Sequence, residues 1–155
     1  MQAARVESCT EWTASQVQAF LIEAAWVLKK MPDSERAAVA ARGNTWPFDF
    51  NQEHASDSDR TRARPTPKQI DRYLPILDWL RLVKSGFDRE LVFRVADWFD
   101  GEAPGQNERI RWSYLIEKHR YTYSRYTLAR RYNHALHVIA GNLNVNPELT
   151  RAAGL

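Results

Sequence analysis

Hydrophobic residues recur at every third or fourth position in several separate segments of the chain, which is the spacing of one buried face of an α-helix. The first such segment runs from Thr13 to Met31, and Pro32 predicts that the helix ends there. We therefore expect a helix with one face in a hydrophobic core. The apolar positions that carry this pattern are Val17, Phe20, Leu21, Ala24, Leu28 and Met31.

A second long helix is expected to begin at Thr66, because the run Thr-Pro-Lys-Gln combines a capping hydroxyl, a proline in the first turn and a capping-box glutamine. Pro75 removes one backbone donor, which predicts a kink or a shortened start. Ser85-Gly86 predicts the end of this helix, and a third helix is expected from Asp88 to Phe99. The apolar stripe of the second helix is Ile70, Tyr73, Leu74, Leu77 and Leu80.

The last third of the chain predicts two further helices. A short pattern covers Glu108 to Lys118, the residues HRYTY interrupt it, and Ser124 is expected to cap the final helix. The final helix is predicted to end near Gly141-Asn142. Because no stretch alternates with the period of a β-strand, the predicted fold class is all-α, with a C-terminal helix-turn-helix. The final helix has an apolar inner stripe that spans about 100° of the helical wheel. The stripe consists of Leu128, Tyr132, Ala135, Leu136, Ile139 and Leu143.

The remaining segments set the predicted domain organisation. Ser34 to Arg42 reads as a short helix that ends at Gly43, and Trp46-Pro47-Phe48 as an extended, partly buried anchor. The polar tract from about 49 to 66 predicts a mobile loop. We expect residues 1–100 to form a helical core that also serves oligomerisation, and 101–155 to form the helix-turn-helix region. A single compact unit is the alternative.

Composition narrows the class of protein. The chain has 155 residues with 44% hydrophobic content, and no apolar run approaches the roughly 18 residues that a membrane span needs. The first residues lack the apolar block of a secretory signal. Cys9 is the only cysteine, which excludes an internal disulfide or a cysteine-cluster zinc site and is consistent with a reducing compartment. We therefore expect a cytoplasmic protein that does not enter a membrane.

The net charge of +3 is unevenly distributed along the chain. Residues 1–60 contain six basic and nine acidic side chains, whereas residues 106–140 contain seven basic and two acidic ones. Clustered lysine and arginine gain free energy by releasing counterions from phosphates. The basic segment therefore predicts a polyanion as partner.

Helix, short connector and longer amphipathic helix is the order of a helix-turn-helix, whose second helix lies in the major groove of DNA. Opposite the inner stripe, the final helix carries groups that can bind base edges or phosphates. The start of that helix also offers free backbone amides to an anion. The predicted DNA-binding residues are Arg109, Arg111, Lys118, Arg120, Ser124, Arg125, Tyr126, Thr127, Arg130, Arg131, Asn133 and His134.

Several short motifs in a fixed order resemble an uncharacterised family of small phage and prophage proteins. They are Trp46-Pro47, then Pro67, Ile70 and Asp71 with the pair Trp79-Leu80, then Arg89 to Ala96, and last Ser124 to Asn144. The resemblance extends from Trp26 onward and implies a C-terminal helix-turn-helix related to those of sigma-factor-like and phage regulatory proteins, in a bacterial host cell. It implies no established activity, and this chain differs by the added stretch FDGEAPGQNERI.

Enzymatic chemistry has little support in the sequence. His134 and His137 lack a third metal ligand nearby, and no Ser-His-Asp or Cys-His pattern is recognisable. We expect the tryptophans at 26, 79, 98 and 112 to pack in the core rather than to bind a ligand. The chain is therefore predicted not to be an enzyme and to need no cofactor or metal.

The favoured function is sequence-specific binding of double-stranded DNA by a phage-type regulator of transcription. Recognition of packaging-start DNA by a small terminase-like protein would use the same chemistry. A different class of function remains open, a phage assembly adaptor that binds an acidic host or virion protein, because Tyr, Trp and Arg are also favoured at protein interfaces. A homodimer through the N-terminal helices is open as well.

Overall fold

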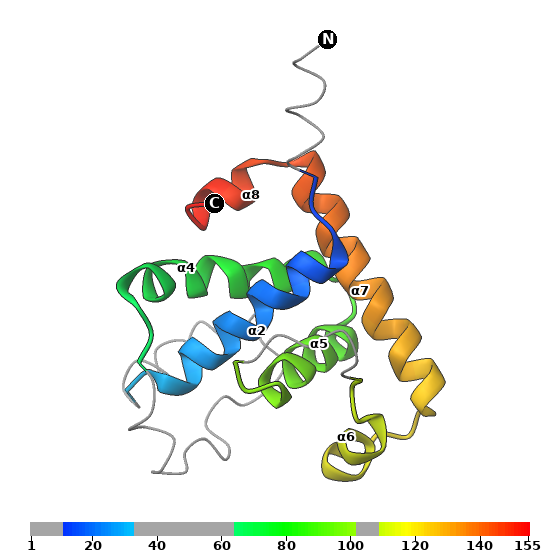
Figure 1. Cartoon of the computed structure of the whole chain (residues 1–155). Helices are drawn as coiled ribbons and strands as arrows, with labels where there is room; N and C mark the ends of the chain where they lie inside the picture. The colour runs from blue at the N-terminus through cyan, green and yellow to red at the C-terminus, as the bar shows by residue number, and fades with distance from the viewer. Residues whose placement is uncertain (1–10, 33–63, 102–108) are drawn as a thin grey trace.

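The computed structural model describes residues 11–32, 64–101 and 109–155, and within these ranges the regular structure is entirely helical (Figure 1). The all-α prediction is therefore confirmed for this part of the chain. The predicted helix at 34–42, the anchor at 46–48 and the loop up to residue 63 lie outside the described residues. The elements are α2 (Ala14–Lys30), α4 (Pro67–Leu77), the 3₁₀ helix η3 (Asp78–Leu82), α5 (Gly86–Trp98), α6 (Trp112–His119), α7 (Arg125–Val145) and α8 (Glu148–Ala152).

Capping boxes begin the first two of these helices. Thr13 and Thr66 each accept a hydrogen bond from the backbone amide three residues later, and the glutamine at that position accepts one from the amide of the threonine. α2 ends at Lys30 with Met31 as its C-cap, close to the predicted end. Pro75 lies inside α4, and the helix tightens into η3 shortly after it.

Ser85 has a different role from the predicted one. It does not end the second helix, because η3 has already ended at Leu82. Instead, the Ser85 side chain accepts a hydrogen bond from the amide of Asp88 over 3.3 Å and caps α5, which starts two residues before the predicted Asp88. A Ser-Gly pair can serve either end of a helix, and here the serine hydroxyl satisfies a free amide of the next helix.

The core forms where α2 meets three other helices. α4 and α5 lie along α2, and α7 crosses the end at which α2 begins (Figure 1). Trp79 is 1% exposed and packs edge-on against Trp12, with ring centroids 5.4 Å apart. Trp26, Trp98 and Trp112 are partly buried against the same core, as expected from their positions on apolar faces. Core residues come from both sides of the predicted boundary at residue 100.

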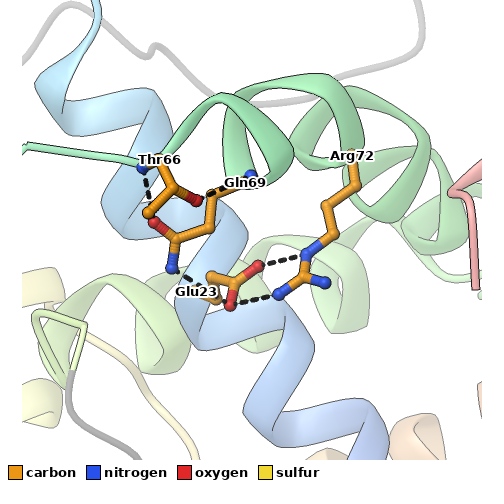
Figure 2. A network of polar contacts seen from close by, with 4 residues as sticks. All are labelled: Glu23, Thr66, Gln69 and Arg72. Atoms are coloured by element: carbon orange, nitrogen blue, oxygen red, sulfur yellow. Dashed lines mark hydrogen bonds and ion pairs between the residues drawn. The ribbon is translucent and has the colours of Figure 1, made fainter.

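A polar network joins α2 to α4 (Figure 2). The carboxylate of Glu23 accepts two hydrogen bonds from Arg72, at 2.7 and 2.8 Å, and a third from Gln69 at 3.4 Å. Both charged side chains are about four-fifths buried, and the Arg72 guanidinium also lies over the Phe20 ring. Because the carboxylate and the guanidinium pair with each other, the network fixes α4 on α2 and leaves no free charge for a ligand.

Candidate nucleic-acid interface

α7 begins where the sequence predicts and ends later. The Ser124 hydroxyl accepts a hydrogen bond from the Thr127 amide over 3.3 Å, so the predicted cap is confirmed. The helix passes through Gly141-Asn142, where its end was expected, and continues to Val145. Two contacts explain the extension. Leu143 is buried and continues the inner stripe, and the Asn142 side chain donates to the Val138 carbonyl over 2.8 Å.

The inner face of α7 fixes the rotation of the helix about its own axis. All six residues of the predicted stripe are buried, none more than 3% exposed. Tyr132, in the middle of the stripe, accepts a hydrogen bond from Gln18 of α2 over 2.7 Å and packs edge-on against Trp112 of α6. Because these contacts hold the apolar side inward, the opposite side must face solvent.

We call that opposite side the outer face of α7 and define it by Tyr126, Arg130, Asn133, His134 and His137. All five are exposed, and Tyr126 is 74% exposed. From the first to the last of them the helix rises by about 17 Å at 1.5 Å per residue. α7 contains no acidic residue along its whole length. The outer face therefore presents hydrogen-bond donors without a carboxylate on the same helix.

The connector between α6 and α7 turns sharply without a glycine. Arg120 ends α6 with φ 56° and ψ 44°, in the left-handed region that glycine usually occupies. Its amide and that of Tyr121 both donate to the Ile116 carbonyl. The absence of a glycine from HRYTY therefore did not prevent a tight helix ending, because an arginine adopts the required conformation at some cost in strain.

α6 is shorter than predicted. It begins at Trp112 rather than at Glu108, which lies outside the described residues. Arg111 precedes it with ψ 77°, outside the helical region, and makes no side-chain cap, so Arg109 and Arg111 stand before the helix and not on it. The sequence missed this start because the segment contains no Ser, Thr, Asp or Asn at the capping position.

Most of the predicted DNA-binding residues are exposed at α6, the connector and the beginning of α7. Lys118 lies over the Tyr114 ring, and Arg125 lies 5.1 Å from the Tyr126 ring centre and donates to its hydroxyl. Thr127 is half-buried, and its amide and side chain form hydrogen bonds with Ser124. The exposed members of the set are Arg109, Arg111, Lys118, Arg120, Ser124, Arg125, Tyr126, Arg130, Asn133 and His134.

Arg131 differs from the rest of the set, because its side chain points to α5. Its Nε lies 2.9 Å from Asp88 Oδ1, and its guanidinium carbon lies 5.0 Å from the ring centres of both Phe87 and Tyr123. Contact with the Tyr123 hydroxyl and the charge of Asp88 raise the pKa of Arg131. The contact of Arg131 with DNA stays a prediction, and unlike the rest of the set its charge is already paired within the protein. No local signal indicates this pairing, because Asp88 lies 43 residues before Arg131 in the chain.

Tyr121 is a second polar group of the connector that packs inward. Its ring lies between those of Phe87 and His119, with centroids 5.5 and 5.7 Å away. Its hydroxyl is buried and has no hydrogen-bond partner among the residues that the structure describes. Burial raises the pKa of Tyr121 to about 12. The connector is thus anchored to α5 by aromatic packing.

Residues 11–32, 64–101 and 109–155 contain no metal site and no membrane span that would suggest another kind of function. No three His, Cys, Asp or Glu residues in these ranges are placed to bind a metal ion together. None of the helices there is both long and apolar enough to cross a membrane. Comparison with models of protein families, with curated proteins and with solved structures gives no match for this chain. A functional assignment therefore depends on the surface formed by α6, the connector and α7.

Proposed function

We propose that this protein binds duplex DNA through the outer face of α7. One observation carries the proposal: the outer face is exposed along about three helical turns, carries Arg, Asn, His and Tyr, and has no acidic residue on its helix. An α-helix fits the major groove, where three or four side chains of such a helix reach base edges. The contacts expected by chemistry are Arg130 with guanine and Asn133 with adenine.

The beginning of α7 supports contacts with the DNA backbone. Lys118, Arg120 and Arg125 are exposed around the Ser124 cap, where the first backbone amides of the helix have no intrahelical partner. Cations and free amides at a helix start both attract phosphate. Arg109 and Arg111, exposed just before α6, add to the positive surface of the same segment. Contacts of this kind supply affinity and register but little sequence preference.

A phage-type regulator of transcription in the bacterial cytoplasm is the use that we propose for this binding. It follows from the motif resemblance, with α6 and α7 acting as the helix-turn-helix. Recognition of packaging-start DNA would place the same residues on the same groove. A homodimer would present two outer faces to two half-sites, which is the usual way that such helices gain specificity.

Binding of a protein partner is the competing proposal. Tyr114, Tyr123 and Tyr126 are among the large exposed hydrophobic side chains, and exposed tyrosine next to arginine is common at protein interfaces. An adaptor of this kind would bind an acidic protein and show no preference among DNA sequences.

Selection from a pool of randomised duplexes distinguishes the two proposals. We expect the protein to retard duplex DNA in a gel and to enrich a common sequence. Asn133→Ala should then lose discrimination at one A·T pair, whereas Lys118→Ala should weaken binding to all sequences alike. A protein that neither retards duplex DNA nor enriches a sequence would exclude the DNA proposal and leave the adaptor.

A further inference from the structure

Three side chains from two segments lie around the guanidinium group of Arg131, which comes from a third segment. Phe87 and Asp88 come from the first turn of α5, Tyr123 comes from the connector, and Arg131 comes from the second turn of α7. Phe87 also packs edge-on against Tyr123, with ring centroids 5.2 Å apart. We call these four residues the aromatic–carboxylate clamp.

The clamp holds the Arg131 side chain against α5. The Asp88 side chain is only 13% exposed, and no well-directed hydrogen bond reaches its Oδ1 from the described residues, so the charge of Arg131 is its main compensation. Withdrawing Arg131 toward a phosphate would leave a nearly buried carboxylate without a counter-charge, which is strongly unfavourable. The guanidinium would also lose two aromatic faces.

The neighbouring arginine has the opposite environment. Arg130 is exposed on the outer face of α7, and no ion pair joins it to any described residue. Successive residues on a helix point about 100° apart. Holding Arg131 against α5 therefore sets the direction in which Arg130 and Asn133 point.

We propose that Arg131 is a positioning residue that determines sequence discrimination, with Asp88 as its partner, and that it makes no contact with DNA. This inference deepens the proposed function and rests on it. The clamp fixes the beginning of α7 and the connector on α5, so that the outer face meets the groove at one angle. Recognition of base edges needs side chains held closely in place, whereas attraction to phosphates tolerates misplacement.

A second contact from α5 supports this role by fixing the other end of the connector. Arg94 pairs with Glu90 over 2.6 Å, and it contacts the ring of His119, the last residue of α6. Both ends of the connector are thus joined to α5 by charged side chains. The connector is built to hold α6 and α7 in one relative orientation.

Asp88→Asn gives the sharpest test, because an account based on charge alone predicts an unchanged ratio of specific to random affinity, whereas positioning by the clamp predicts a lower one. Removing a carboxylate near a DNA surface should raise affinity for every sequence if only charge matters. If the clamp positions α7, the ratio of affinity for the selected site to affinity for random duplex should instead fall about tenfold, the worth of one base contact. Asp71→Asn, an exposed change of equal charge on α4, is the control and should leave the ratio unaltered.

The experiment measures the ratio of specific to random affinity and the slope of log affinity against log salt concentration, below the unfolding temperature. It compares the full chain with Asp88→Asn, Arg131→Gln and Tyr123→Leu. We expect the ratio to fall in all three variants and the salt slope to stay the same in Arg131→Gln. A slope smaller by about 0.9 with an unchanged ratio would make Arg131 a phosphate contact. An unchanged ratio in Asp88→Asn or in Tyr123→Leu would also overturn the inference.

Failure of the inference and failure of the proposed function look different. If the unaltered chain binds no duplex, the proposed function fails and the inference fails with it. If the unaltered chain selects a sequence and the clamp variants keep the full ratio, only the inference fails.

Discussion

Gln18 donates its side-chain amide to the hydroxyl of Tyr132 over 2.7 Å, which joins α2 to the middle of α7. Tyr132 is 2% exposed, so this bond satisfies a buried polar group. We predict that Tyr132→Phe lowers the free energy of unfolding by about 1 kcal/mol, the usual net value of one hydrogen bond. Urea unfolding followed by circular dichroism measures it, and an unchanged midpoint would show that the bond contributes nothing.

Tyr121→Phe should have the opposite effect. The Tyr121 hydroxyl is buried without a partner among the described residues, so the protein bears its desolvation cost. Removing the hydroxyl while keeping the ring should raise the free energy of unfolding by about 1 kcal/mol. The two tyrosine variants form a matched pair in the same assay, and a loss of stability in Tyr121→Phe would mean that the hydroxyl has a partner in solution.

The raised pKa of Tyr121 also predicts how the free energy of unfolding changes at alkaline pH. Burial raises the pKa of Tyr121 to about 12 in the folded chain, and an unfolded tyrosine has a pKa of about 10. Between these values the unfolded chain releases a proton that the folded chain keeps, so stability is full below about pH 10 and is lost as the pH rises toward 12. Burial also raises the pKa of Tyr132, which acts in the same direction.

Urea midpoints at about pH 9 and pH 11 test the alkaline prediction. We expect a lower midpoint at the higher pH and a smaller difference in Tyr121→Phe, which cannot ionise at that position. If the midpoint falls equally between the two pH values in the variant and in the unaltered chain, Tyr121 does not cause the loss of stability at alkaline pH. Other groups would then be responsible.

At position 120 glycine should give a more stable protein than alanine, which is the reverse of their usual order in helices. Arg120 has a φ of 56°, a region that costs residues with a Cβ about 1 kcal/mol or more. Arg120→Gly should therefore be more stable than Arg120→Ala by about 1 kcal/mol. Both variants lose the same charge, so they serve as a matched pair in thermal unfolding and in DNA binding. If the alanine variant is the more stable one, the left-handed turn does not form.

Local signals in the sequence predicted much of the helical fold. Thr66 and Ser124 cap helices as predicted, because an N-cap depends on a hydroxyl and an amide only three residues apart. The inner stripe of α7 was equally predictable, since a single helix presents it every three or four residues. Elements with weak local signals were missed, among them the 3₁₀ turn after Leu77 and the five-residue helix at the end of the chain.

Contacts between distant segments explain the differences within the candidate site. Arg130 and Arg131 look alike in the sequence, and only the fold brings Asp88 and Phe87 to one of them. Periodicity assigned Asp88 to the beginning of a helix and could not show what its carboxylate meets. The exposed side of α7 was thus predictable, whereas the aromatic–carboxylate clamp was not.

DNA recognition by α7 is tested most directly by the salt dependence of duplex binding, measured for the unaltered chain, Arg130→Ala and Lys68→Ala. Lys68 is an exposed lysine at the beginning of α4, far from the beginning of α7 (Figure 1), and serves as the charge-matched control. We predict that affinity falls steeply with salt, that Arg130→Ala costs about 1–3 kcal/mol at the selected site, and that Lys68→Ala changes nothing. Binding that ignores ionic strength, or equal losses in both variants, would contradict DNA recognition by α7.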